Sequence, residues 1–217
     1  MKRPKILIAG YGSWAKTKEN PAEAIALELG ESTWDCCETV GVALPVDTAT
    51  LSSEIDTLLT EHSPDAWIGI GVSSSANVQA EFIGINWRAF DVPDVGGKKI
   101  EGAAIIEGGA AAYRATLPNF EIVEAMKAAG IPSGVSFHAG THLCNQMLYT
   151  TAHQIQARGL RTLTGFIHVP RTPANLFELD DLKMNKPSMS LAQSSKAVAR
   201  CVETTAHTLI KQSEKCA

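Results

Sequence analysis

The chain has 217 residues, of which 45% are hydrophobic and 19% are charged, and its formal net charge is −4. This composition suits one folded domain with a full core, and the scattered Lys and Arg residues exclude the basic surface that nucleic-acid binding needs. No apolar run is long enough to span a bilayer, so we expect neither a membrane nor a nucleic acid as a partner.

The start of the chain and its cysteines indicate a cytoplasmic protein. The apolar residues that follow the basic N-terminus stop at Gly10, which is too early for a signal peptide and typical of a first β-strand. The cysteines are odd in number, show no metal-type spacing and include no Cys-x-x-Cys, so we expect free thiols in a reducing compartment and no metal site. The five are Cys36, Cys37, Cys144, Cys201 and Cys216.

Short apolar strands alternate with helical segments along the chain. In order, we expect strands at 5–9, 39–46, 67–72, 80–86, 134–137 and 163–168, and helices at 21–29, 49–61, 120–129, from about 144 and from 191. The Gly- and Asp-rich stretch 88–109 is expected to be irregular. Ser190 and Gln193 form a predicted capping box for the last helix, and one face of that helix carries Leu191, Val198, Cys201, Val202 and Leu209.

The alternation predicts an α/β fold, a three-layer α/β/α sandwich around a mostly parallel, mixed, twisted sheet. We find no repeat, low-complexity tract or linker, so residues 1–217 are expected to form a single domain. Sites in such folds lie in loops at the carboxyl ends of strands. Four features fall there, namely the loop from Tyr11 to Trp14, the loop 73–77, the turn before Cys144, and His168.

Cys144 is the leading candidate for a nucleophile. It follows the small-residue turn 139–141 at the expected start of a helix, where the positive end of the helix dipole favours the nucleophilic thiolate. His168 ends an apolar strand and is a candidate base. From spacing alone, a core cysteine and a structural histidine are the commoner explanation, because only the fold can bring the two together.

Several motifs occur in a fixed order along the chain. The most specific are Ala139-Gly-Thr-x-x-Cys144-Asn145 and Phe166-Ile-His-Val-Pro170, and others lie at 10–14, 20–21, 81–86, 93–94, 109–118 and 187–191. Together they resemble pyroglutamyl peptidase I, a family of cytosolic cysteine peptidases, and the resemblance covers nearly the whole chain. The resemblance implies Cys144 as nucleophile, His168 as base and Glu81 as the residue that orients the imidazole. It also implies hydrolysis of an N-terminal pyroglutamyl group through a thioester, without a metal or organic cofactor.

The resemblance further implies a pocket for a short peptide or small molecule, and here the chain departs from the family. Tyr11 and Trp14 stand where the family has phenylalanines. In the loop after the third strand, residues 71–76 include three serines and lack the Gln, the paired Gly and the Arg that are typical of the family. Asp91 stands at a family arginine; Arg88 could substitute only if its loop were re-routed, and otherwise lies on the surface. His142 could contact the ligand or lie exposed. The expected pocket residues are Tyr11, Trp14, Val72, Ser73, Arg88, His142 and Leu143.

Three functions follow from this pattern. The chain could be a pyroglutamyl peptidase with a divergent pocket, a related cysteine amidohydrolase for another small cyclic amide or acyl group, or a non-catalytic homologue. The retained Cys, His and Glu favour an enzyme, whereas the aspartate at the arginine position favours the non-catalytic alternative. Members of the family that the chain resembles commonly form homo-oligomers, so we also expect a homo-oligomer here.

Overall fold

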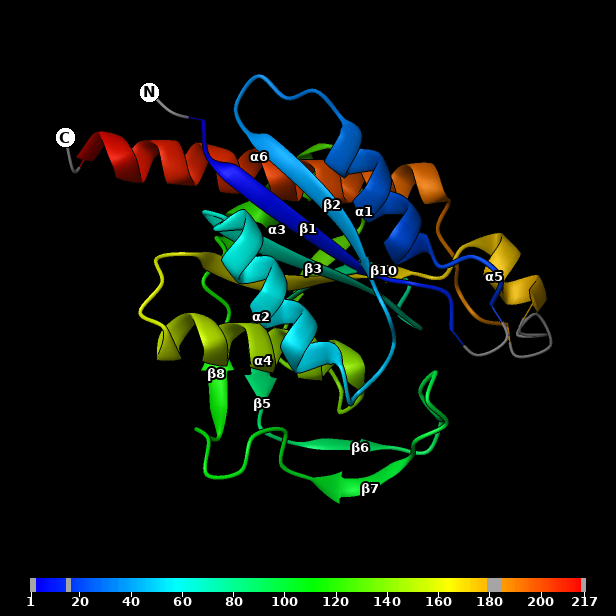
Figure 1. Ribbon diagram of the computed structural model, residues 1–217. Helices are drawn as coiled ribbons and strands as arrows, with labels where there is room; N and C mark the ends of the chain where they lie inside the picture. The colour runs from blue at the N-terminus through cyan, green and yellow to red at the C-terminus, as the bar shows by residue number, and fades with distance from the viewer. Residues whose placement is uncertain (1–2, 15–16, 179–184, 216–217) are drawn as a thin grey trace.

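A six-stranded sheet forms the middle layer of the computed structural model, which describes residues 3–14, 17–178 and 185–215 (Figure 1). Every neighbouring pair is parallel except β10 with β4, so the predicted mostly parallel, mixed sheet is confirmed. In spatial order the strands are β2 (Glu38–Leu44), β1 (Lys5–Tyr11), β3 (Ala66–Ser73), β10 (Leu163–Pro170), β4 (Val78–Glu81) and β9 (Ser133–Ser136).

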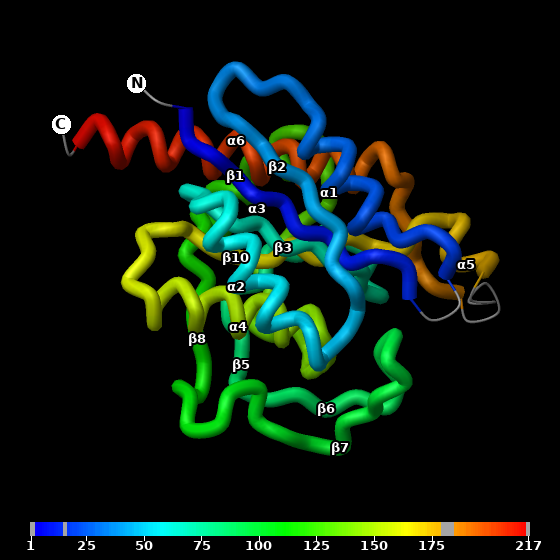
Figure 2. Tube along the Cα trace, viewed as in Figure 1, coloured from blue at the N-terminus to red at the C-terminus, as the bar shows by residue number. Residues whose placement is uncertain are grey.

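Helices cover both faces of this sheet, which confirms the predicted sandwich (Figures 1 and 2). One face is covered by α1 (Pro21–Glu31), α3 (Asn119–Ala128) and α6 (Leu191–Lys215), and the other by α2 (Leu51–His62) and α4 (Leu143–Ala157). Successive residues of β1 face opposite sides, so Ile6 and Ile8 enter the first core and Leu7 and Ala9 the second. Burial on both faces explains why the central strands are uninterrupted apolar runs.

The region predicted as one strand, 80–86, is two strands in two sheets. After β4, the chain leaves the main sheet at Phe82, whose N–H donates to Ser136 O and whose carbonyl accepts from Ala115 N. The following β5 (Ile83–Ile85) pairs antiparallel with β8 (Ala112–Arg114). Asn145 of α4 holds β5 in this place, because its amide bonds both the N–H and the carbonyl of Ile85.

The stretch 88–109 was predicted to be irregular, and this is wrong in part. It contains an antiparallel pair, β6 (Arg88–Phe90) and β7 (Ile100–Ala103), that lies below α4 in Figure 1. The pair is only three to four residues long and its register shifts between Arg88 and Phe90, so little alternation reaches the sequence. The strand β8 and the short helix α5 (Pro173–Glu178) were also not predicted.

The last helix begins as predicted. Ser190 Oγ accepts from Gln193 N, although the Gln193 side chain accepts from that hydroxyl and does not reach a backbone N–H. Val198, Cys201 and Val202 are buried, whereas Leu191 is exposed. Cys36, Cys37, Cys144 and Cys201 are free thiols, and Cys216 lies outside the described residues. Within the described ranges, no helix has the length and apolar character needed to cross a membrane.

Candidate active site

The carboxyl ends of β1, β3 and β10 meet at one edge of the sheet. These strands are parallel neighbours, and their registers place Gly10 beside Ile70 and Gly71 beside His168. The first turn of α4 lies against the same edge, since the side chain of Tyr11 donates a 2.6 Å hydrogen bond to Leu143 O. This edge is therefore where strand-end loops and the Cys144 helix come together.

Cys144 is the second residue of α4. The turn before it requires Gly140, whose φ of +81° is one that L side chains rarely adopt. His142 occupies the N-cap position but makes no side-chain cap, so its side chain does not take up the first N–H groups of the helix. Tyr11 stays a donor to Leu143, because burial, and secondly the charge of Cys144, raise the pKa of Tyr11 well above 10.0.

Gly71 leaves the space in which the Cys144 sulfur sits. A Cβ atom at this position would lie 2.8 Å from Cys144 Sγ and 2.8 Å from Cζ of Phe166. Real side chains do not approach so closely, so the sulfur packs directly on the β3 backbone. The glycine therefore fixes where the thiol lies relative to the sheet.

His168 and Glu81 form a buried pair beside the thiol. His168 Nδ1 lies 2.7 Å from Glu81 Oε1, and the two residues are only 7% and 1% exposed. The ring of Phe166 packs edge-on against the imidazole, with 5.0 Å between ring centroids. The second carboxylate oxygen of Glu81 is buried and has no hydrogen-bond partner in the described part of the chain, so the His168 bond is the main compensation for burying this carboxylate.

The electrostatics of His168 favour the imidazolium. Burial lowers its pKa, but the charge of Cys144, its hydrogen bond to Cys144, and the hydrogen bond and charge of Glu81 together raise the pKa from 6.5 to about 10. The imidazole thus has the thiol as one neighbour and the carboxylate as the other. An imidazole whose pKa is raised, placed between a thiol and a carboxylate, is the arrangement of a nucleophile, a base and an orienting group.

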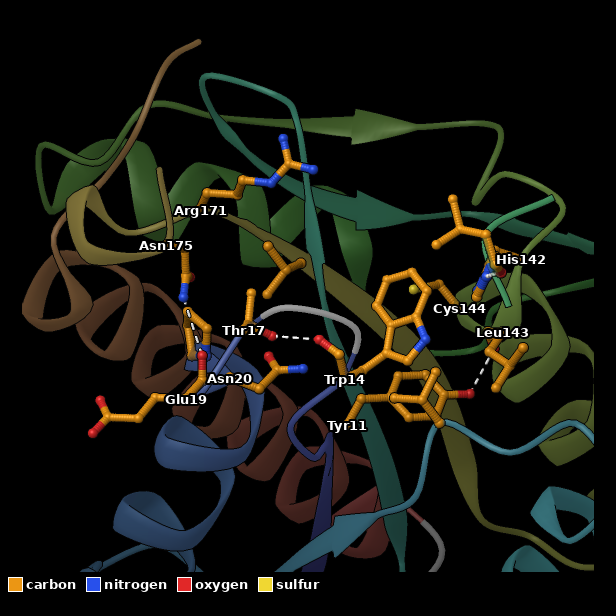
Figure 3. Close-up of a pocket in the computed structure, with 14 residues that line it drawn as sticks. Tyr11, Trp14, Thr17, Glu19, Asn20, His142, Leu143, Cys144, Arg171 and Asn175 are labelled. Carbon is orange, nitrogen blue, oxygen red and sulfur yellow. Dashed lines mark hydrogen bonds between the residues drawn. The ribbon is translucent and has the colours of Figure 1, made fainter. Parts of the chain in front are cut away.

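A cavity of about 380 Å³ opens in front of Cys144 (Figure 3). His168 and Glu81 are not among its lining residues; Cys144 is the one member of the trio that faces the cavity. The lining residues are Tyr11, Trp14, Thr17, Glu19, Asn20, Pro21, Val46, Val72, Val92, His142, Leu143, Cys144, Arg171 and Asn175.

One wall of the cavity is an aromatic corner built from Trp14 and His142. Their ring centroids are 4.9 Å apart, and Phe90 packs on the other side of His142 at 4.4 Å. Main-chain carbonyls fix both rings, because Trp14 Nε1 donates to Pro93 O at 2.7 Å and His142 Nε2 lies 3.2 Å from Val92 O.

The His142 ring is neutral near pH 7. Burial lowers its pKa from 6.5, against the opposing effects of the Val92 carbonyl and the carboxylates of Asp94 and Asp91. Since a carbonyl only accepts, the geometry assigns the proton of the neutral ring to Nε2 and leaves Nδ1 as an acceptor. Asp91 is exposed, and its charge is the weakest of these effects on His142.

Five of the expected pocket residues line this cavity, namely Tyr11, Trp14, Val72, His142 and Leu143. Ser73 and Arg88 do not. The Ser73 hydroxyl accepts from Ser75 N within its own loop. Arg88 lies in β6, donates to Thr48 Oγ1 and lines a different cavity, because its segment pairs with β7 and is not re-routed toward Cys144. These positions speak against the expectation that Ser73 and Arg88 bind substrate.

Sequence reasoning missed several residues of the cavity. Arg171 directly follows β10 and Val46 lies two residues after β2, so the rule that sites lie at carboxyl ends of strands could have found them. Val92 and Asn175 carry no local signal. Val92 lies in the stretch that was predicted to be irregular, and Asn175 lies in the helix α5, which was not predicted. Within the described residues, no group of three or more His, Cys, Asp or Glu side chains is placed to hold a metal ion.

Comparison with known proteins identifies the family. The sequence profile of pyroglutamyl peptidases matches residues 4–208, which include Glu81, Cys144 and His168. The chain belongs to the pyroglutamyl peptidase family. It is 31% identical to pyrrolidone-carboxylate peptidase of Pyrococcus furiosus over 207 residues, covering 95% of this chain and 100% of that protein. It is 33% identical to the enzyme of the same name from Thermococcus litoralis, covering 93% and 92%.

The fold agrees with solved members of the family. The crystal structure of pyrrolidone carboxyl peptidase from Pyrococcus furiosus superposes with a TM-score of 0.89 at 31% identity and covers 94% of this chain and 99% of that one. The family and the fold that the sequence predicted are therefore both confirmed.

Proposed function

We propose that this protein is a cysteine peptidase that removes an N-terminal pyroglutamyl group from short peptides. The observation that carries the proposal is the geometry around Gly71. The sulfur of Cys144, a residue at the start of α4 and on the wall of the cavity, packs on Gly71. The strand neighbour of Gly71 is a buried His168 that Glu81 holds at 2.7 Å. Membership of the pyroglutamyl peptidase family supports the same activity.

In acylation, the Cys144 thiolate attacks the carbonyl that joins the pyroglutamyl group to the next residue. The free N–H groups in the first turn of α4 are the donors for the resulting oxyanion. His168, held as imidazolium, gives its proton to the leaving amine, and a thioester remains on Cys144.

In deacylation, His168 is neutral after that transfer and takes a proton from an attacking water. The thioester then breaks, free pyroglutamate leaves, and the thiolate–imidazolium pair is restored. Glu81 keeps the ring oriented and stabilises its positive charge in both steps.

The wall of the cavity leaves room for a second function in the same chemical class, although membership of the family does not favour it. Trp14 and a neutral His142 give this wall a large ring and an acceptor nitrogen, and Glu19 and Arg171 add charged groups to the lining. A cyclic amide other than pyroglutamate could fit such a wall. A non-catalytic role is disfavoured, because a buried carboxylate and imidazole beside a thiol are costly to keep without chemistry.

The deciding experiment is hydrolysis of a pyroglutamyl-linked fluorogenic amide by the wild-type protein and by Cys144→Ala. Cleavage that is lost in the variant establishes both reaction and nucleophile. A folded wild type that does not cleave it, while Cys144 is alkylated by iodoacetamide much faster than free cysteine, rejects the pyroglutamyl substrate in favour of another amide. Slow alkylation together with no cleavage rejects both functions.

We also propose that residues 1–217 act as one catalytic domain in the cytoplasm, without a cofactor, and as a homo-oligomer. The four free thiols in the described part of the chain support a reducing compartment. The family resemblance supports assembly. Light scattering tests the oligomer directly, and a mass equal to one 23.1 kDa chain at micromolar concentration would exclude it.

A further inference from the structure

A second cavity, separate from the one at Cys144, is lined by residues of β6, β7 and α4 and by the start of α2. Its volume is about 320 Å³. Its lining residues are Thr48, Ala49, Ser52, Arg88, Lys98, Ile100, Ile105, Ile106, Gln146 and Thr150. It shares none of these with the cavity at Cys144, and the proposed peptidase reaction uses none of them.

The charges of this cavity are of one sign. Arg88 and Lys98 line it, and no carboxylate does. Within the described residues, neither cation forms an ion pair. The nearby carboxylate of Asp94 is already engaged, because its oxygens accept from the backbone N–H groups of Thr48 and Lys98.

Arg88 is held in place by a hydrogen bond, but not all of its donors have acceptors. One guanidinium nitrogen of Arg88 donates to Thr48 Oγ1 at 2.7 Å, and that hydroxyl donates in turn to Gln146 Oε1 at 2.7 Å. Arg88 itself is half-buried, but its Nε is buried and has no acceptor in the described part of the chain. The same holds for the hydroxyl of Thr150, a cavity-lining residue that is 1% exposed. A buried donor left unused is costly unless an acceptor completes it.

The rest of the wall is apolar. Ile100, Ile105 and Ile106 face the same space. The start of α2 adds the positive end of a helix dipole, and its N-cap residue Thr50 makes no side-chain cap. The cavity thus combines anion donors on one side with hydrocarbon on the other.

We propose that this cavity binds a small organic anion, a phosphate ester or carboxylate with a short apolar chain. The charged head accepts from Arg88 and Lys98, and the chain packs on the three isoleucines. Arg88 therefore belongs to an anion site behind the nucleophile helix. Through Thr48 and Gln146 this site touches α4, the helix that carries Cys144.

The test is calorimetric titration of the full-length protein in Tris chloride at constant ionic strength, with Cys144 first alkylated so that the other cavity is blocked. n-Butyl phosphate and pentanoate are the two probes, and the tighter of them distinguishes a phosphate ester from a carboxylate. Inorganic phosphate supplies the charge alone. We expect saturable binding of at least one organic probe at one site per chain, tighter than inorganic phosphate, because the apolar chain adds burial.

Two variants and a matched control decide whether this site is responsible. Arg88→Met and Lys98→Met should each weaken binding about tenfold or more, since each removes a charge-assisted hydrogen bond. Lys99→Met, at the exposed neighbour that does not line the cavity, should leave affinity unchanged. Lys98→Met keeps the hydrogen bond from Arg88 to Thr48. If Arg88→Met does not fold, the affinity of Lys98→Met therefore shows whether this cavity binds the anion. No saturable binding of either probe, or equal losses in Lys98→Met and Lys99→Met, would overturn the proposal.

Discussion

Glu81 reaches His168 diagonally across the antiparallel pair of the six-stranded sheet. In the register Glu81 lies opposite Phe166, and His168 lies opposite Gln79. Residues two apart on a strand share a face, so the side chains of Glu81 and His168 meet on one side of the sheet at 2.7 Å. β4 and its parallel neighbour β9 both run opposite to the other four strands, and a β4 that ran parallel to β10 would not end at this point. The reversed direction of β4 therefore delivers the carboxylate.

Replacing Glu81 by Gln tests the role of this charge. The amide oxygen can still accept from His168, but the negative charge that stabilises the imidazolium is gone. We expect kcat to fall by about 10³-fold or more, as an order of magnitude for losing the carboxylate of a catalytic triad. Glu124→Gln, an exposed carboxylate on α3, should be unaffected in the same assay. A loss of less than about threefold in Glu81→Gln would contradict the orienting role.

The raised pKa of His168 predicts the alkaline limit of activity. Protonated His168 stabilises the folded state, and this contribution is complete below pH 6.5 and lost as pH rises to about 10. The leaving amine needs the same proton, so kcat/KM should hold through neutral pH and fall as pH approaches about 10. In Glu81→Gln the fall should begin at lower pH, because one cause of the raised pKa is removed. A pH profile between 5 and 11 measures both, and a wild-type fall near 6.5 would rule out the pair.

Gly71→Ala should lower activity by displacing the sulfur of Cys144, although Cys144 itself is unchanged. The new Cβ would lie 2.8 Å from Cys144 Sγ, so the sulfur must turn from its place. Misplacement of a reacting atom by about 1 Å costs on the order of 10²-fold, and we expect this loss in kcat together with slower alkylation of Cys144. Gly134→Ala is the matched control, since its Cβ would meet only Asn77 Nδ2 at 3.4 Å. Full activity in Gly71→Ala would show that the sulfur lies elsewhere.

Asn145→Ala should destabilise the protein. The Asn145 side chain is fully buried and makes three hydrogen bonds, to Ile85 N, Ile85 O and Trp87 O. Losing them leaves buried backbone groups without partners, which costs about 3 kcal/mol in total. For a chain of this size that corresponds to a melting temperature lower by about 6–12 °C. Gln156→Ala, at an exposed position near the end of α4, should change it by less than about 2 °C, and a similar drop in both variants would refute the argument.

Trp14→Phe tests whether the aromatic corner binds substrate. The change removes the bond from Nε1 to Pro93 O and shortens one wall of the cavity. We expect KM to rise several-fold with kcat nearly unchanged, the pattern of lost uniform binding. Thr60→Ala, on the exposed outer side of α2, provides the comparison. A change confined to kcat would instead place Trp14 near the reacting atoms.

The sequence predicted the central sheet well and its margins poorly, for a physical reason. The strands β1, β3 and β10 are buried on both faces, so their apolar runs stand out. The helices α1 and α6 are also marked by the capping residues Asn20 and Ser190. In contrast, β4 and β5 are continuous in sequence and part only because Phe82 bonds to two distant segments. Such a separation is decided by tertiary contacts and leaves no local pattern.

The same division holds for the site. Cys144 and His168 stand at recognisable positions, a helix start and a strand end. Arg88 was expected near the substrate, but its direction depends on the β6–β7 register, which the sequence does not encode locally. Val92 reaches the cavity by the same route. Glu81 carries no signal of its own, and only the family resemblance singled it out.

The aromatic corner has a consequence for how this wall can vary during evolution. Trp14 and His142 are both anchored on main-chain oxygens, those of Pro93 and Val92. Every residue type supplies such an oxygen, so the side chains at 92 and 93 can drift while the two rings keep their anchors. The two ring positions, in turn, can exchange one aromatic for another that carries an N–H without any compensating change in the opposite loop. A wall of this kind lets substrate preference shift by single substitutions.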